Sequence, residues 1–504
     1  MQPFATRPLA TGLAPYVPDV TQPWDHYRAA HLLRRTTFMP RWSEIDQIAN
    51  LSPSEAVDLL LNTPSQPAPP TIVDSETESL DGLDTVSQNM VRNKWEADAG
   101  VLRKWMVETM TESPLSIYEK MTLFWSGHFT TEFEVDGDYV VAPLLYRQNK
   151  LLRENGLKNF RDLVFYVTLD GAMLVYLGGN LNNAGRPNEN YARELLELFT
   201  TGLGWYTEGD VQNAARILTG WRIAMFSDKP KPNGPFATYF LPSSHDINGK
   251  QFLGVPFPAR DITTNTEFIV RRDEVKKLVD TIFEVRPQAV AKFISRKIYN
   301  FFVYANPAQN DESVIDAMAE LFIASDFEIK PVMSALLKSQ HFFDNANIGA
   351  QIKTPAELTV GFSRQLTPPV NPHAKMPALG QVLFDPPNVS GWPGYHDWVT
   401  TSTYPRRAEL AEEVLSKMTD AIALEFIKQF PDHTNASKLI DQVALLLLPR
   451  KLSTARKAAL MDTLLGGAPD YEWPNILSST PSSAVRQMKD VLGRITELPD
   501  FQLS

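Results

Sequence analysis

Apolar residues along most of this chain recur three and four positions apart, which is the spacing of one face of an α-helix. Alternating strand patterns are nearly absent, and no fixed-period repeat occurs. The pattern predicts helices near residues 86–112, 118–125, 138–154, 158–168, 188–200, 208–220, 266–283, 286–303, 312–323, 328–339, 354–364, 406–418, 420–430, 435–447 and 483–496. We therefore expect an all-α fold.

Two short motifs mark helix starts. In residues 52–55 a serine caps the first turn, a proline fits the first helical position, and a glutamate completes a capping box. Thr207 and Asp210 repeat the capping-box spacing. Both motifs predict a helix that begins at the next residue.

Two stretches interrupt the helical pattern. Residues 226–262 are rich in proline and glycine, which indicates a long loop or a small hairpin excursion. Residues 383–405 are irregular and rich in aromatic side chains. The predicted organisation is an extended N-terminal arm, a large multi-helix domain with a loop-rich central insertion, and a C-terminal helical bundle, with boundaries at 1–24, 25–225, 226–262, 263–405 and 406–504.

Composition narrows the class of protein. The net charge of -11 over 504 residues argues against nucleic acid as a partner, because phosphate binding needs a dense basic surface. The absence of cysteine excludes disulfides, thiolate metal sites and cysteine nucleophiles. The longest apolar runs, at 163–167 and 444–448, are too short to span a bilayer, so we expect no transmembrane segment. We expect a periplasmic or secreted protein whose leader is not in this chain, with a cytoplasmic location as the alternative.

Helix 188–200 carries the most informative polar pattern. Asn190, Arg193, Glu194 and Glu197 fall at i, i+3, i+4 and i+7, so all four project from one side of the helix. If Glu194 and Glu197 were buried together, the pKa of one would be raised and that of the other lowered, as acid/base hydrolysis requires. Arg193 and Asn190 would then bind the substrate. The alternatives are a buried structural network and a solvated face.

Three further positions are candidates for a site. His128 follows an aromatic helix end and is a candidate general base or a packed core histidine. His245 and Asp246 lie in the irregular insertion, where substrate-binding residues are common. Trp392 lies in an aromatic loop that would stack on a sugar ring or fill a core.

The eight histidines show no tight metal-ligand spacing, so we assign no metal residues and no cofactor. A site assembled from distant segments, such as His128, Glu194 and His245 together, stays open at this point. Nucleophile-elbow, Walker and dinucleotide-binding motifs are missing from the sequence.

Nine motifs in a fixed order resemble those of one protein family. They are found at residues 31–35, 124–129, 159–162, 186–198, 210–221, 245–254, 293–297, 353–355 and 380–392. This set resembles the DUF1800 family, which consists of large bacterial proteins without an established function. The resemblance covers residues 25 to 410 and implies no reaction. It does imply export and a sulfatase-like partner protein.

Two positions depart from the family pattern. Ser126 stands where the family has the first histidine of its tryptophan segment, and Phe199 stands where it often has another histidine. If those histidines bind a metal elsewhere in the family, this chain has lost two ligands.

Three functional hypotheses follow. The first is an exported hydrolase that acts on a polysaccharide or similar polymer through Glu194 and Glu197, with His128, Asn190, Arg193, His245, Asp246 and Trp392 in support. The second is a non-catalytic binding or structural protein of the cell surface or a secreted assembly, with a polysaccharide or small-molecule ligand. The third is a metal-dependent oxidoreductase, which the residues at 126 and 199 disfavour.

Overall fold

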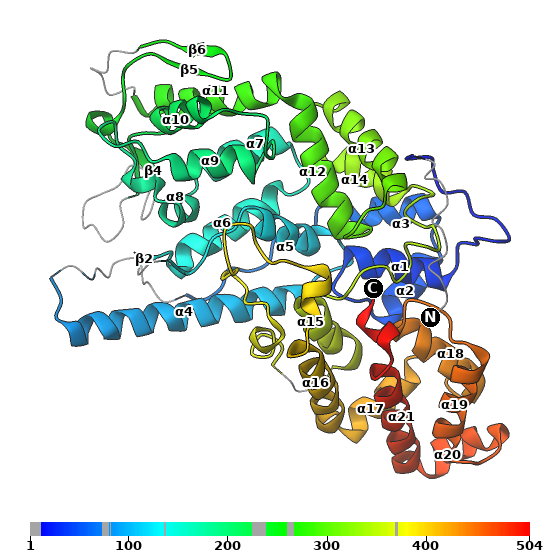
Figure 1. The fold of residues 1–504 in the computed structure, drawn as a ribbon. Helices are drawn as coiled ribbons and strands as arrows, with labels where there is room; N and C mark the ends of the chain where they lie inside the picture. Colours follow the sequence, from blue (N-terminus) through cyan, green and yellow to red (C-terminus); the bar gives the residue numbers. More distant parts are fainter. Residues whose placement is uncertain are drawn as a thin grey trace.

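In the computed structural model, α-helices are the dominant secondary structure of the described residues, as the apolar spacing predicts (Figure 1). It describes residues 12–72, 80, 82–135, 138–223, 238–259, 267–367 and 371–504. Residues 1–11 of the predicted N-terminal arm lie outside the described residues, and so do residues 226–237 and 260–262 of the predicted insertion. The all-α prediction is confirmed.

Many of the helices follow one another through short connections, but long segments separate α3 from α4, α10 from α11 and α15 from α16. The first ten are α1 (His26–Thr36), α2 (Trp42–Ala49), α3 (Pro53–Leu60), α4 (Thr85–Glu112), α5 (Tyr118–His128), α6 (Ala142–Asn155), α7 (Phe160–Thr168), α8 (Gly171–Tyr176), α9 (Glu189–Glu197) and α10 (Glu208–Ile217). The next are α11 (Glu267–Val285), α12 (Pro287–Phe302), α13 (Glu312–Ala324), α14 (Ile329–Leu337), α15 (Pro355–Leu366), α16 (Thr403–Lys417), α17 (Asp420–Lys428), α18 (Ala436–Leu447), α19 (Thr454–Leu465), α20 (Trp473–Ser479) and α21 (Pro481–Thr496).

Local sequence signals set many of these boundaries. Both predicted capping boxes are present, at Ser52 before α3 and at Thr207 before α10. The predicted ranges omit α1, α2, α8, α19 and α20. Of these, α8 has only six residues, and α19 and α20 bury few of their residues. Short or weakly amphipathic helices show little periodicity in the sequence, and tertiary packing decides whether they form.

Strands in the described residues form three small antiparallel pairs. They are β1 (Glu134–Val135) with β2 (Asp138–Tyr139), β3 (Trp221–Ile223) with β4 (Thr238–Phe240), and β5 (Lys250–Phe252) with β6 (Val255–Phe257). The described part of the insertion is thus a hairpin excursion, and β5 packs against α10.

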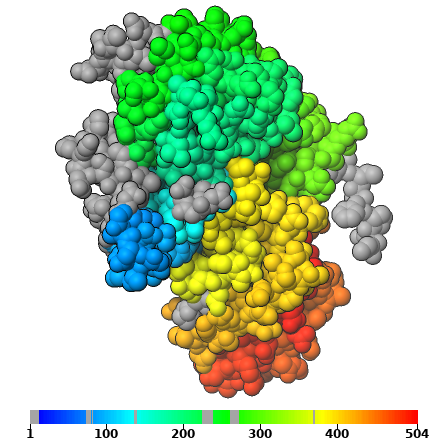
Figure 2. Space-filling view, turned by 60° about the vertical axis from the view of Figure 1, so that its left-hand side comes forward, coloured from blue at the N-terminus to red at the C-terminus, as the bar shows by residue number. Residues whose placement is uncertain are grey.

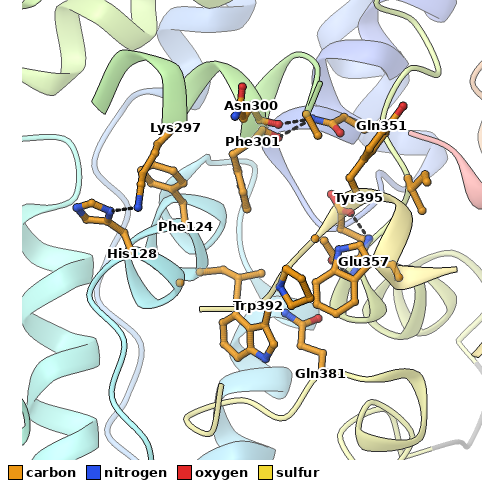
Figure 3. Close-up of a pocket in the computed structure, with 18 of the residues that line it drawn as sticks. Phe124, His128, Lys297, Asn300, Phe301, Gln351, Glu357, Gln381, Trp392 and Tyr395 are labelled. Carbon is orange, nitrogen blue, oxygen red and sulfur yellow. Dashed lines mark hydrogen bonds between the residues drawn. The ribbon is translucent and has the colours of Figure 1, made fainter. Parts of the chain in front are cut away.

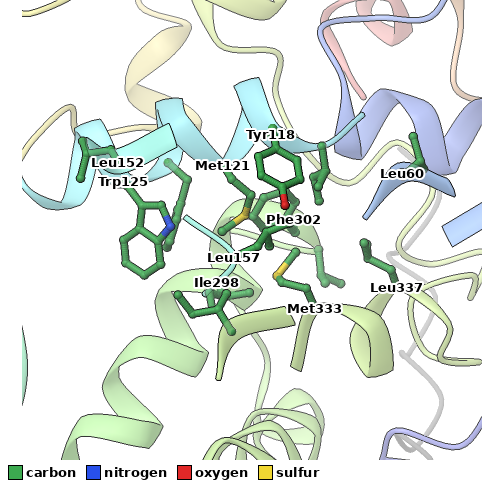
Figure 4. Packing of buried hydrophobic residues seen from close by; sticks show 14 of the residues in the cluster. Leu60, Tyr118, Met121, Trp125, Leu152, Leu157, Ile298, Phe302, Met333 and Leu337 are labelled. Carbon is green, nitrogen blue, oxygen red and sulfur yellow. The ribbon is translucent and has the colours of Figure 1, made fainter. Parts of the chain in front are cut away.

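One apolar core joins the N-terminal and C-terminal helices. It extends in sequence from Tyr16 to Phe501. Helix α5 runs through its centre, where Met121 and Trp125 contact a layer that includes Ile298 of α12 and Met333 of α14 (Figure 4). Because α5 is buried along its length, its C-terminal end is held rigidly.

The irregular, aromatic segment around residues 381–398 lies at the surface between the green helices and the C-terminal helices in orange and red (Figure 2). It packs against the C-terminal end of α5 through an unusually close backbone contact. Gly391 has φ +88°, and a Cβ at this position would stand 2.5 Å from the carbonyl oxygen of Gly127. Only glycine allows this approach.

Candidate functional site

A cavity of about 380 Å³ lies where α5, α12, the N-terminus of α15 and the 381–398 segment meet (Figure 3). Its lining contains an amine, a guanidinium, a carboxylate, an imidazole, side-chain amides and several aromatic rings. The residues are Arg35, Leu123, Phe124, Gly127, His128, Lys297, Asn300, Phe301, Ala305, Gln351, Ile352, Thr354, Glu357, Gln381, Trp392, Pro393, Gly394, Tyr395 and Trp398. Such a mixture of apolar walls and a few polar groups is typical of small-molecule sites.

Lys297 and His128 meet at one end of this cavity (Figure 3). Lys297 Nζ lies 3.1 Å from His128 Nδ1 and 3.3 Å from the carbonyl oxygen of Leu198. The other ring nitrogen of His128, Nε2, lies 3.1 Å from the carbonyl oxygen of Phe199. A carbonyl oxygen only accepts, so Nε2 carries the hydrogen and Nδ1 accepts a hydrogen bond from the lysine.

Lys297 lacks an acidic partner in the described part of the chain. Burial lowers the pKa of Lys297 from 10.5 to about 8, and no carboxylate offsets that effect. Burial, followed by the positive charge of Lys297, holds the pKa of His128 well below its usual 6.5. The site therefore presents an uncompensated ammonium beside a neutral imidazole.

Helix α12 holds the lysine in place. Ile294, Ile298 and Phe302 of this helix are buried in the core. Lys297 and Phe301, one turn apart, line the cavity on another side. A side chain on a helix anchored in this way keeps a defined position, which a site needs.

At the opposite end of the cavity, the side chains of Glu357 and Gln381 already have partners within the protein. Glu357 forms a buried ion pair with Lys120, and its other oxygen accepts the Thr354 N–H at 2.7 Å in the capping box of α15. Gln381 Oε1 accepts the N–H of Ala356 at 2.9 Å. The only side-chain carboxylate among the lining residues is therefore neutralised by a lysine behind it.

Aromatic rings form the walls between these ends. They come from α5, α12 and the 381–398 segment: Phe124, Phe301, Trp392, Tyr395 and Trp398. The Trp392 ring covers Gly127, 3.7 Å from where a Cβ would stand. These rings offer flat apolar faces to a bound molecule.

Two of the predicted site residues, His128 and Trp392, line this cavity, and the other six do not. On α9, Arg193 donates to both carboxylate oxygens of Glu208, at 2.8 and 2.7 Å, and lies 3.6 Å from Glu189. Glu197 accepts from the hydroxyl of Tyr206 at 2.7 Å. Asn190 is exposed.

The two glutamates of α9 do influence each other. Burial, together with the nearby charge of Glu197, raises the pKa of Glu194. Both side chains are only partly buried. Acid/base catalysis by this pair stays a prediction.

The other predicted pair belongs to a separate polar network. Nδ1 of the buried His245 lies 2.7 Å from the Thr219 carbonyl oxygen, and its Nε2 lies 3.4 Å from Glu274. Asp246 instead accepts from Arg216 at 2.6 Å. The two side chains diverge and connect the insertion to α10 and α11, and their role in substrate binding also stays a prediction.

Lys297 is the cavity residue that sequence reasoning missed. It ends the 293–297 motif, and Gln381 lies within the 380–392 motif, so both positions were visible as parts of a family pattern. Neither position has a local spacing that indicates chemistry. Glu357 and Lys120 are 237 positions apart, and no local pattern reports such a pair.

Within the described residues, no group of three or more histidine, cysteine or acidic side chains is arranged to hold a metal ion. The same part of the chain contains no helix with the length and apolar character needed to cross a membrane.

Comparison with known proteins gives one match. Neither the curated proteins nor the solved structures contain a significant match to this chain. The family model described as "Protein of unknown function (DUF1800)" matches residues 31–503, which is nearly the whole chain. The protein is therefore a member of the DUF1800 family.

Proposed function

We propose that this protein binds a small organic molecule that has a flat, ring-shaped body and an anionic oxygen group such as a carboxylate. The observation that carries the proposal is the uncompensated ammonium of Lys297 at one end of an aromatic-walled cavity. The anionic group pairs with Lys297, and the ring lies against Trp392 and Phe301.

Charge supports the anionic part of the ligand. An ammonium that is largely shielded from water and has no opposite charge nearby is costly, and an anion within hydrogen-bond distance offsets that cost. Nδ1 of His128 and the Leu198 carbonyl oxygen both accept from Lys297, so neither can supply the missing negative charge. An anionic ligand supplies it.

Size and shape support a small ring. Small-molecule sites commonly occupy roughly 300–1,000 Å³. At about 380 Å³ this cavity is near the small end of that range and fits a molecule of one or two rings. Offset or edge-on contact with an aromatic wall adds about 0.5–1.5 kcal/mol beyond the burial of area.

Calorimetric titration with benzoate tests the proposal, because benzoate has one ring and one carboxylate. We expect binding that weakens at least tenfold in Lys297→Met. The matched control is Lys276→Met, which removes an exposed lysine paired with Asp280 and leaves the affinity unchanged. Absence of benzoate binding, or equal binding by Lys297→Met, contradicts the proposal.

The hydrolase hypothesis is a second candidate, favoured by the raised pKa of Glu194 beside Glu197. On this hypothesis the protonated Glu194 donates to a glycosidic oxygen. Glu194→Gln should then fold normally and abolish release of reducing ends from a polysaccharide panel. Unchanged release by this variant, or no release by the native protein, rules the hypothesis out.

A further inference from the structure

We propose that Lys297 is also a nucleophile, and that its ε-amine forms an imine with an aldehyde or ketone bound in the cavity. This inference rests on the proposed function, because the carbonyl compound occupies the same cavity as the anionic ligand.

The arrangement around Lys297 is that of an activated nucleophile. Nζ lies 3.1 Å from Nδ1 of His128, whose lone pair accepts a hydrogen bond from the lysine and is therefore placed to take its proton. The Phe199 carbonyl oxygen, 3.1 Å from Nε2, holds the ring in the tautomer that keeps this lone pair available. A nucleophile, a base and a group that orients the base thus stand in a row, as in enzymes with covalent intermediates.

Accessibility separates Lys297 from the other buried lysines. Lys353 also has a pKa lowered by burial, to about 7, but it is 2% exposed and does not line the cavity. Its Nζ donates to the carbonyl oxygen of Phe501 at 2.7 Å. Burial lowers the pKa of Lys120, but its amine is held in an ion pair with Glu357, whose charge opposes that effect. Lys297 lines the cavity and has no carboxylate partner in the described part of the chain.

The chemistry needs no oxidant or reductant. The neutral amine attacks the carbonyl carbon, a C–N bond forms, and the carbonyl oxygen becomes a hydroxyl group. Two protons leave the amine nitrogen in turn, each through His128 Nδ1. The first converts the carbonyl oxygen into the hydroxyl group, and the second joins that hydroxyl group as the C–O bond breaks and water departs. The product is an imine between Lys297 and the bound carbonyl compound, and aromatic side chains flank it.

Reductive trapping tests this inference. The protein is incubated with benzaldehyde and cyanoborohydride at pH 7.5, and the benzylated lysines are located by peptide mass spectrometry. We expect Lys297 to be modified at least tenfold faster than Lys276, and excess benzoate to suppress its modification. Modification of Lys297 no faster than of Lys276 overturns the inference.

Two variants separate this inference from the proposed function. Lys297→Arg keeps a cation but has no nucleophilic amine, so it should still bind benzoate within about threefold. If the native protein binds benzoate but is not trapped at Lys297, only the imine proposal is wrong. If the native protein neither binds benzoate nor is trapped at Lys297, the proposed function is wrong as well.

The second variant, His128→Gln, keeps a hydrogen-bond acceptor for the lysine but cannot take its proton. Trapping should therefore slow at least threefold, and an unchanged rate overturns the role of His128.

Discussion

Two groups of charged side chains, the polar side of α9 and the Lys297 end of the cavity, differ in how their charges are balanced. On α9, Arg193 is paired with Glu208 through two hydrogen bonds, and Glu197 accepts from Tyr206. At the cavity, the partners of Lys297 among the described residues are a neutral imidazole, a carbonyl oxygen and an aromatic ring. The motif with more charged and polar residues in the sequence is therefore the one whose charges are already paired in the structure.

The comparison teaches that the number of charged residues in a motif is a weak guide to a site. Charges that are already paired with each other have little left to offer a ligand. A single charge without a partner, held beside a cavity, retains its full capacity to bind. Three substitutions sharpen this contrast.

The largest effect is expected where a buried pair is broken. Lys120→Met leaves the buried Glu357 carboxylate without its cation, and we expect the free energy of unfolding to fall by about 3–5 kcal/mol. Urea denaturation measures this loss. The double variant Lys120→Met/Glu357→Gln should recover much of it, and a double variant as unstable as the single one contradicts this reading.

A smaller effect of opposite sign is expected at Lys297. Its folded pKa is about 8 and its unfolded value 10.5, so the folded state binds this proton less tightly. Below pH 8 the charged Lys297 lowers the free energy of unfolding by its full amount. This loss of stability disappears as the pH rises to 10.5. Lys297→Met should therefore stabilise the protein at pH 7 by about 1–3 kcal/mol, at about 1.4 kcal/mol per pKa unit.

Denaturation midpoints of native protein and Lys297→Met, measured between pH 7 and pH 10.5, check this prediction. The advantage of the variant should shrink across that window. A variant that is less stable than the native protein at pH 7 would mean that the ammonium already has a partner.

The smallest effect is expected on α9. Arg193 and Glu208 are both partly or largely exposed, and ion pairs of this kind contribute little to stability. Arg193→Met should change the midpoint of urea denaturation far less than Lys120→Met does. A loss as large as that of Lys120→Met would show that this side of α9 belongs to a buried network.

Sequence reasoning recovered the helices better than the site. Apolar spacing placed α4 and α10 within a few residues of their observed ends, because helix periodicity and caps are local properties. The same reasoning singled out His128 and Trp392, which both line the cavity. It missed Lys297, because nothing local distinguishes a lysine at a cavity from one in water.

Contacts between residues far apart in the sequence explain the remaining differences between the predicted and the observed partners of charged side chains. The bidentate partner of Arg193 proved to be Glu208, fifteen positions further on and outside the helix where partners were sought. Lys120 and Glu357 come from α5 and α15, which only the fold brings together. A pattern of spacing within one helix contains no information about such contacts.

The pKa of Lys297 itself tests the central claim most directly. It can be followed by NMR of lysine methylene groups labelled with carbon-13, assigned with Lys297→Arg, with and without benzoate. We expect a value near 8 in the free protein, and a higher one with benzoate because a nearby anion favours the charged amine. A value near 10.5 in the free protein, or no change on adding benzoate at a concentration that saturates any binding, would contradict the account.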